Sequence, residues 1–476
     1  MTTRIPAAIA AAIIIASSAA VFAQTQPDQA MIDRARGIHD RVITMDTHVD
    51  ISAARFTTAC NYTMRLTTQV NLPKMKEGGL DAPFLIVYTG QGALTPEGFD
   101  GAYKQAVEKF DAVHRLVKEI APNEIELALT PADVVRINKA GKKVAIIGVE
   151  NGYPIGTDLE RVKEFYERGG RYMSLAHNGN SQLADSNSTE AANGGIHGGL
   201  SQLGKQVIAE MNKWGMMVDI SHPSKQANMQ AIALSKAPVI ASHSSVRALA
   251  NHTRNMDDEL LLALKKNGGV MQTVAFATYV KVDEHGPARQ AAVAALGQEF
   301  GVAAAPGGGR GAGGGRQGGE APAANQPAAC PVEDGAAAGT APQAAGRAGG
   351  GGGRGGGNAA AIAALPEDRR VEYTRRLSEI NAKYPVPERA TVADFVNHID
   401  YAVKLIGIDH VGISSDFDGG GGVTGWNSAS ETFNVTLELV KRGYTEEQIA
   451  KLWSGNLLRV WAEVEKVAKQ IQAGGQ

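Results

Sequence analysis

The sequence predicts an α/β protein: a (β/α)8 barrel of the TIM type, with a disordered Gly/Ala-rich insertion between its seventh and eighth strands. Two observations lead to this fold class. Eight short runs rich in apolar and β-branched residues alternate with amphipathic helical stretches, a pattern typical of a parallel sheet. Polar residues gather near the C-terminal ends of these runs, and such ends meet at one mouth when eight parallel strands close into a barrel.

The predicted elements follow one another in the order that this fold requires. The strands are at residues 43–50, 83–89, 144–150, 172–177, 216–222, 238–243, 269–276 and 410–416. Helices between them are predicted at Gly101–Glu119, Asp158–Arg168, Ser201–Lys213 and Asp257–Lys266. Two further helices, near 366–382 and 391–406, precede the last strand. One barrel domain over residues 24–476 accommodates all of them, which is simpler than two domains.

Residues 1–23 have the order of a signal peptide. Arg4 precedes an apolar stretch over 5–22, and Val21 and Ala23 occupy the small-residue positions before a cleavage site. A membrane anchor is the alternative, because the stretch approaches the length of a membrane span. The small residues at its end and the lack of a second apolar segment favour cleavage. We therefore expect an exported protein, periplasmic or secreted, without a stable membrane anchor.

Residues 301–358 consist almost entirely of Gly, Ala, Pro, Gln and Arg. Such a segment lacks the apolar side chains needed to offset the entropy lost on ordering, so a flexible insertion is predicted. Its arginines are too sparse, and lack the interleaved aromatic residues, for RNA binding of the Arg-Gly type. The formal net charge of the chain is only -2. Both observations indicate that nucleic acid is not a partner.

The chain has two cysteines, Cys60 and Cys330. Two thiolates cannot form the usual four-thiolate zinc site, so a metal here would use histidines and carboxylates. An exported compartment permits a disulfide between the two cysteines. Cys330, however, lies inside the low-complexity insertion. The sequence therefore leaves their pairing open.

Asp50 and Glu150 each end a predicted strand. His48 and Asp50 form an H-x-D pair, and residues two apart on a strand point to the same side, here the barrel interior. Such a pair alone is usually a surface or core feature, and its position at a strand end strengthens the case. Glu150 ends the apolar run VAIIGVE. A buried carboxylate without a partner is costly, so Glu150 should meet a metal or the cation of a salt bridge.

Histidines end the next runs in the same way. His222 ends VDISH and His243 ends VIASH; either alone would more often be a hydrogen-bonded core residue. With His48, Asp50 and Glu150 they supply three imidazoles and two carboxylates, which suit zinc. With Glu150 shared, the set is sufficient for two zinc ions per chain, about 3.5–4 Å apart. Such a pair would activate a bridging water and polarise a substrate carbonyl, as amide hydrolysis requires.

Three further residues have a functional and a structural interpretation each. Asp416, in SSDFDG, could move the proton from water to the leaving amine or could serve as a turn residue before Gly419. His177 could stabilise the oxyanion of the tetrahedral intermediate or be structural. Arg254 could bind a carboxylate through both arms of its guanidinium or form a surface ion pair. Asp418 is better placed than Asp416 for capping.

These motifs together resemble the membrane (renal) dipeptidase family of amidohydrolase-like metallopeptidases. They occur in the family's order and cover nearly the whole chain apart from the insertion. The matching segments are DTHVD at 46–50, IGVEN at 147–151, RYMSLAHN at 171–178, VDISH at 218–222, PVIASHSS at 238–245, HTRN at 252–255, GIDHVGISSDFDG at 407–419 and SGNLLRVW at 454–461.

The resemblance implies a role for each residue of the set. His48 and Asp50 would bind one zinc ion, His222 and His243 the other, and Glu150 both. His177 and Arg254 would contact the substrate, and Asp416 would manage the proton. Family members cleave dipeptides, frequently with a D-residue at the C-terminal position, and are often homodimers.

The expected function is therefore zinc-dependent hydrolysis of small dipeptides. Two alternatives remain open at this point. The same binuclear site would serve an N-acyl-amino-acid deacylase or a lactonase, because both use the same activated water. A non-catalytic binding protein on this scaffold is disfavoured, because every ligand and Asp416 are present.

Overall fold

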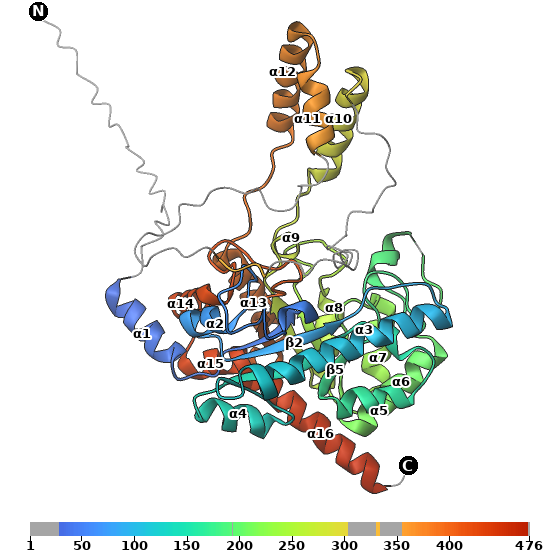
Figure 1. Cartoon of the computed structure of the whole chain (residues 1–476), viewed down its shortest axis with the longest axis vertical. Helices are drawn as coiled ribbons and strands as arrows, with labels where there is room; N and C mark the ends of the chain where they lie inside the picture. The colour runs from blue at the N-terminus through green and yellow to red at the C-terminus, as the bar shows by residue number, and fades with distance from the viewer. Residues whose placement is uncertain (1–27, 193, 303–329, 334–354, 475–476) are drawn as a thin grey trace, which may run out of the picture.

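Eight parallel strands form the centre of the computed structural model, which describes residues 28–192, 194–302, 330–333 and 355–474 (Figure 1). They pair in a single sheet in the order in which they occur along the chain. The backbone N–H of Asp50 donates to the carbonyl of Phe417 at 2.9 Å and joins the first strand to the chain just after the last. All eight predicted strands are confirmed: β1 (Met45–Asp50), β2 (Ala82–Tyr88), β4 (Lys143–Glu150), β5 (Gly170–Ser174), β6 (Met217–Asp219), β7 (Ile240–Ser244), β8 (Val270–Val274) and β9 (Val411–Ser414).

Apolar side chains fill the interior of the barrel at the N-terminal ends of its strands. Phe84 of β2 lies 5.4 Å from Tyr172 of β5 and 6.4 Å from Trp461 of the C-terminal helix, measured between ring centroids. Leu85, the next residue of β2, belongs instead to the larger cluster that packs beneath the outer helices. Side chains alternate in this way along a strand, and burial on both faces makes each strand a continuous apolar run. The opposite end of the barrel is left for polar residues.

Helices follow the strands around the outside of the barrel. Thr130 and Thr391 each begin a helix by accepting from the backbone of the aspartate three residues later, which returns the bond as in a capping box. The predicted helices are all confirmed to within a few residues. In the barrel they are α3, α5, α6, α8 and α13. The bounds of all the barrel helices are α1 (Gln29–His39), α2 (Leu72–Gly78), α3 (Pro96–Arg115), α4 (Pro131–Lys139), α5 (Glu160–Glu167), α6 (Gln202–Trp214), α7 (Lys225–Leu234), α8 (Asp258–Asn267), α9 (Ala277–Val280), α13 (Val392–Ile406), α14 (Phe433–Lys441), α15 (Glu446–Ala450) and α16 (Asn456–Gly474).

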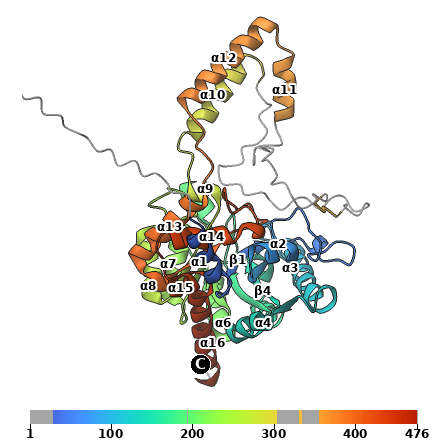
Figure 2. The same cartoon turned by 90° about the vertical axis from the view of Figure 1, so that its left-hand side faces the viewer.

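A helical arm projects from the barrel between β8 and β9 (Figures 1 and 2). It consists of α10 (Gly286–Glu299), α11 (Gly355–Ala363) and α12 (Glu367–Lys383). Leu296, Phe300 and Tyr373 form a small core of its own, separate from the clusters of the barrel. The helix predicted near 366–382 is α12. Most of the predicted flexible insertion, at 303–329 and 334–354, lies outside the described residues.

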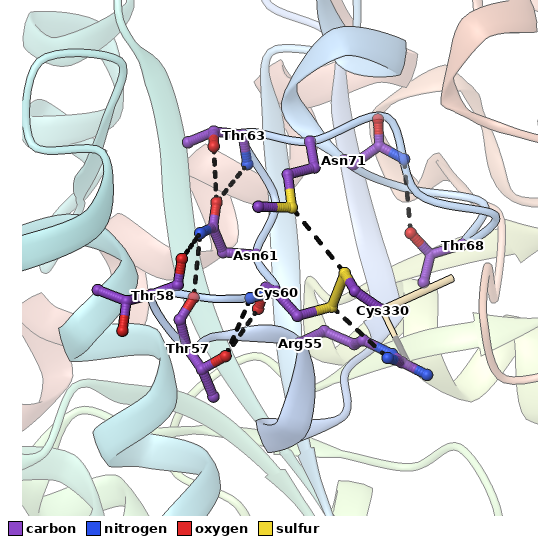
Figure 3. Close-up of a disulfide and its surroundings, with 10 residues drawn as sticks. Arg55, Thr57, Thr58, Cys60, Asn61, Thr63, Thr68, Asn71 and Cys330 are labelled. Carbon is purple, nitrogen blue, oxygen red and sulfur yellow. Dashed lines mark hydrogen bonds between the residues drawn. A yellow bond between two sulfur atoms is a disulfide. The ribbon is translucent and has the colours of Figure 1, made fainter. Parts of the chain in front are cut away.

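Four residues within the insertion are attached to the barrel. Cys330 forms a disulfide with Cys60, across 270 residues of sequence, which answers the question that the sequence left open (Figure 3). Val332 forms an antiparallel bridge with Leu66. Glu333 pairs with Lys74 of α2 at 2.7 Å, and the Lys74 side chain is only 6% exposed. The disulfide and the backbone bridge thus attach residues 330–333 to the loop that follows β1, and the ion pair attaches them to α2.

The ends of the chain have a different status. The predicted signal peptide, residues 1–23, lies outside the described residues. Among the helices that the structure describes, none combines the length and the apolar character that a membrane crossing needs. The short strand β3 (Ile125–Leu127) pairs with β4 outside the barrel ring and was not predicted from the sequence.

Candidate metal centre

All the predicted site residues meet at the C-terminal mouth of the barrel. All but Arg254 lie on the last residues of a strand or within three residues after it, so the parallel arrangement brings their side chains to the same end. Arg254 lies in the loop between β7 and α8. The contributing strands are β1 for His48 and Asp50, β4 for Glu150, β5 for His177, β6 for His222, β7 for His243 and Arg254, and β9 for Asp416.

Glu150 lies between the imidazoles and offers one oxygen to each side. Its Oε1 is 2.8 Å from Nε2 of His222 and 3.3 Å from Nε2 of His243. Its Oε2 faces the other way, 3.5 Å from Nε2 of His48. A carboxylate in this position can contact two cations at once, one through each oxygen.

Two carboxylates complete the side of His48. Its Nε2 lies 3.9 Å from Oδ2 of Asp50 and 3.9 Å from Oδ1 of Asp416. Three overlapping triplets of donor atoms result, and the atoms of each lie within 4.8 Å of one another. The triplets are His48, Glu150 and His243; Glu150, His177 and His222; and His48, Asp50 and Asp416.

A hydroxyl group fixes the tautomer of His243. Ser242 Oγ donates to Oδ2 of Asp219 at 2.6 Å, so it must accept from Nδ1–H of His243, which is 2.8 Å away. Nδ1 therefore carries the proton, and the lone pair of Nε2 points into the site. This arrangement is typical of a histidine that ligates metal.

The Tyr172 hydroxyl fixes the tautomer of His48 in the same way. The Tyr172 hydroxyl donates to the carbonyl of Thr47 at 3.0 Å and lies 3.0 Å from Nδ1 of His48. Nε2 of His48 and Oδ1 of Asp50 are buried and have no hydrogen-bond partner. Buried acceptors without a partner are costly, and a cation would satisfy both. The residues at the mouth thus fit a metal pair.

Glu150 and His48 shift each other's pKa. Burial opposes its ionisation, but the surrounding histidines, His48 first, lower the pKa of Glu150 well below its usual value. Burial likewise lowers the pKa of His48, yet Glu150, Asp416 and Asp50 outweigh it and raise that pKa to about 10. The three carboxylates thus favour positive charge at this position of the mouth.

Asp416 differs from the other carboxylates. Burial raises its pKa well above the usual value, and the charges of Asp50 and Glu150 add to this against the effect of His48. Its backbone has a φ of 58°, a left-handed conformation that is rare outside glycine. A Cβ on Gly421 would come within 1.9 Å of the carbonyl of Ser415, so the glycines after Asp416 are needed to close this turn.

Asp418 joins two loops through its side chain. Its carboxylate accepts from the backbone N–H groups of Gln69 at 2.8 Å and Val70 at 3.3 Å. It therefore holds the loop after β1 against the loop after β9. Positive φ values at Asn151, His222, Asp416 and Asp418 place every left-handed non-glycine residue of the described chain around the mouth, as is common at functional sites.

His177 and Arg254 border the metal ligands from two sides. His177 Nε2 lies 3.8 Å from Oε1 of Glu150, and burial lowers the pKa of His177 to about 4, so the ring is neutral. Arg254 is 5% exposed, and its Nη2 donates to the carbonyl of His243 at 3.1 Å. Its Nε is buried without a partner, and among the described residues no carboxylate pairs with it. The surface ion pair considered for Arg254 is therefore wrong.

The residues that contact the predicted site residues from behind were not identified from the sequence. Asp219 and Ser242 lie in VDISH and VIASH, so their spacing from the histidines was a usable signal. No sequence signal pointed to Tyr172 and Tyr279, because only the fold brings them close to the site. Tyr279, on α9, has its ring centroid 5.5 Å from the Arg254 guanidinium.

Comparison with known proteins places the chain in a family. The family model described as membrane dipeptidase (Peptidase family M19) matches residues 32–475. The crystal structure of the probable dipeptidase PvdM from Pseudomonas aeruginosa is 31% identical, with a TM-score of 0.70, over 93% of this chain and 100% of that one. Dipeptidase tcpJ from Claviceps purpurea (strain 20.1) is 26% identical over 85% of this chain and 72% of its own length.

More distant structures share the fold. A metallo peptidase from Rhodobacter sphaeroides, liganded with a phosphinate mimic of the dipeptide L-Ala-D-Ala, is 19% identical, with a TM-score of 0.58, over 89% of this chain and 99% of that one. The barrel, its mouth and the match over nearly the whole chain lead to one conclusion. The chain belongs to the membrane dipeptidase family, Peptidase family M19, and is a metallo-dipeptidase by that membership.

Proposed function

We propose that the protein is a zinc-dependent dipeptidase that hydrolyses the peptide bond of small dipeptides, including those with a D-residue at the C-terminal position. The observation that carries the proposal is the division of Glu150 between two groups of donors. His222 and His243 lie on its Oε1 side and His48 on its Oε2 side. His48 and Asp50 would hold one zinc ion and His222 and His243 the other, with Glu150 shared.

The chemistry divides between the metal pair and the residues around it. Two zinc ions, when bound, would lower the pKa of water and polarise the scissile carbonyl. Asp416 would take up the proton of the attacking water and deliver it to the leaving amine. Its raised pKa supports this role, because a carboxylate of raised pKa takes up a proton from water more readily and still holds it near neutral pH.

Two residues would position the dipeptide. The buried guanidinium of Arg254 has an unpartnered Nε, so it would bind the C-terminal carboxylate as a charge-assisted pair. His177, 3.8 Å from Glu150, would donate to the oxygen on which negative charge develops. The names of the relatives support a dipeptide as substrate, and the ligand of the Rhodobacter protein mimics L-Ala-D-Ala, a dipeptide with a D-residue at its C-terminal position.

An assay with two substrate classes tests the proposal. Purified protein should contain about two zinc ions per chain by elemental analysis. It should hydrolyse L-Ala-D-Ala and L-Ala-L-Ala, with N-acetyl-alanine as the comparison, and a chelator should abolish hydrolysis until zinc is returned. Faster cleavage of N-acetyl-alanine would favour the deacylase alternative instead. Glu150→Gln should retain less zinc than the wild type, and full zinc content in that variant would contradict the shared carboxylate.

The compartment and the assembly belong to the same proposal. We propose an exported protein, because a disulfide joins Cys60 to Cys330 and disulfides persist in oxidising compartments. The signal-like order of residues 1–23 agrees with this location. The homodimer stays a prediction that rests on the family resemblance.

A further inference from the structure

A lysine outside the predicted set reaches the rim of the mouth. Lys109 lies on α3, and its Nζ is 5.5 Å from the centroid of the Tyr88 ring. Tyr88 is the last residue of β2 and pairs in register with Glu150. The Tyr88 hydroxyl lies 3.4 Å from Nδ1 of His177. One aromatic ring therefore separates the ammonium of Lys109 from a predicted substrate contact.

Apart from the Tyr88 ring, the charge of Lys109 has no partner among the described residues. Its side chain is half-buried, and among the described residues no carboxylate lies within salt-bridge distance of it. Burial lowers the pKa of Lys109, and the charges of Asp50 and Glu150 act against this shift, so their field extends to the ammonium. Zinc ions bound to Asp50 and Glu150 would neutralise that field. A carboxylate of the substrate would then supply the negative charge that the half-buried Lys109 lacks.

Lys109 and Arg254 stand on opposite sides of the barrel. Tyr88 ends β2, and Arg254 follows β7, which is four positions away in the order of the eight barrel strands. Glu150 and the histidines lie between them. A dipeptide whose C-terminal carboxylate binds Arg254, with its peptide bond at the metal ligands, therefore directs its N-terminal residue toward β2 and Lys109.

We propose that Lys109 is a specificity-determining residue that binds a carboxylate in the side chain of the N-terminal residue of the substrate. The inference rests on the proposed dipeptidase function and names its substrate class: dipeptides that begin with an acidic residue. The ammonium is a point charge that accepts many approach directions, so aspartate and glutamate both fit. The α-ammonium of the substrate has the same sign as Lys109 and is repelled from this position.

Two isosteric substrates test the assignment. The wild type should cleave Glu-Ala with a kcat/KM roughly tenfold higher than Gln-Ala, since a charge-assisted contact has about this effect. Lys109→Gln should remove the preference by raising the KM for Glu-Ala, and should leave Gln-Ala within about twofold of the wild type. Lys104→Gln is the matched control, because Lys104 lies on the same helix and is exposed; it should keep the preference.

Other results would overturn the assignment. Equal rates for Glu-Ala and Gln-Ala in the wild type would do so, and this comparison needs no variant to fold. Equal loss with both substrates in Lys109→Gln would show that the lysine acts on the fold or the metals. If no dipeptide is cleaved, the proposed function fails, and calorimetric titration of the zinc-loaded protein with both dipeptides still decides the role of Lys109: equal affinities refute it.

Discussion

Two of the imidazoles at the mouth, those of His243 and His48, each contact a hydroxyl group that determines which ring nitrogen faces the site. Ser242→Ala removes the hydroxyl between Asp219 and His243, so His243 no longer has a fixed tautomer. We expect zinc affinity to fall about 10–100-fold, measured by competition with a chromogenic chelator. Ser245→Ala is the control, because that buried hydroxyl donates to the carbonyl of Val274 and not to a ligand. Unchanged zinc affinity in Ser242→Ala would exclude the positioning role.

Asp416 is the residue whose proposed role lies in proton transfer. Asp416→Asn keeps the shape of the side chain but can no longer carry a proton between water and amine. We expect kcat for L-Ala-D-Ala to fall by a factor of at least about 100, while zinc content by elemental analysis stays close to that of the wild type. Retention of full activity would rule out this role.

Arg254 lends itself to a test with a modified substrate. Arg254→Ala removes the guanidinium that would hold the C-terminal carboxylate, so KM for a dipeptide should rise about tenfold or more with a smaller change in kcat. A dipeptide amide lacks that carboxylate and should be nearly insensitive to the substitution. Equal losses for the dipeptide and its amide would speak against carboxylate binding.

At the scale of elements, the barrel strands were predictable, whereas only α12 of the three helices of the arm was predicted. A strand buried on both faces is a continuous apolar run, so each of the eight could be located from its composition. β3 has three residues, too few for a recognisable pattern. α10 is rich in Ala and Gly, and this composition conceals the periodicity of an amphipathic helix. Lys109 was missed because its distance from Tyr88 depends on how α3 packs against β2.

The disulfide between Cys60 and Cys330 stabilises the attachment of residues 330–333 to the barrel. Cys330→Ser releases residues 330–333 from the loop after β1 and deprives the buried Lys74 of its contact with Glu333. We expect the free energy of unfolding to fall by about 2–4 kcal/mol, measured by urea denaturation. Wild-type protein treated with a reductant should match the variant, and the variant itself should not respond to reductant. A wild type that is insensitive to reduction would contradict the expectation.

At the scale of the whole molecule, buried neutral histidines should make the fold sensitive to acid. Burial, aided by Arg254 and Arg247, lowers the pKa of His252 to about 4, against about 6.5 in an unfolded chain. Burial also lowers the pKa of His398, whose Nδ1 accepts from the backbone N–H of Val246 at 3.1 Å. Between these values the unfolded state binds protons that the folded state does not, so stability is lost as pH falls from about 6.5 toward about 4.

Denaturation at two pH values measures this effect. With a chelator present to keep metal out of the balance, the free energy of unfolding should be lower at about pH 5 than at about pH 7.5. His252→Gln keeps an acceptor beside the backbone of Arg254 but does not titrate, so the difference between the two pH values should shrink. A protein that is equally stable at both pH values would refute the linkage.

The bond between Cys60 and Cys330 also decides what a protease cut leaves behind. A cut between Val302 and Cys330 puts one cysteine on each piece, and the two pieces migrate together on a denaturing gel until a thiol is added. A cut between Glu333 and Gly355 leaves both cysteines on the N-terminal piece. The C-terminal piece, which carries β9 and Asp416, then separates on the same gel without any thiol. Its association in the native state depends on non-covalent contacts, which include the ion pair between Arg41 and Glu446.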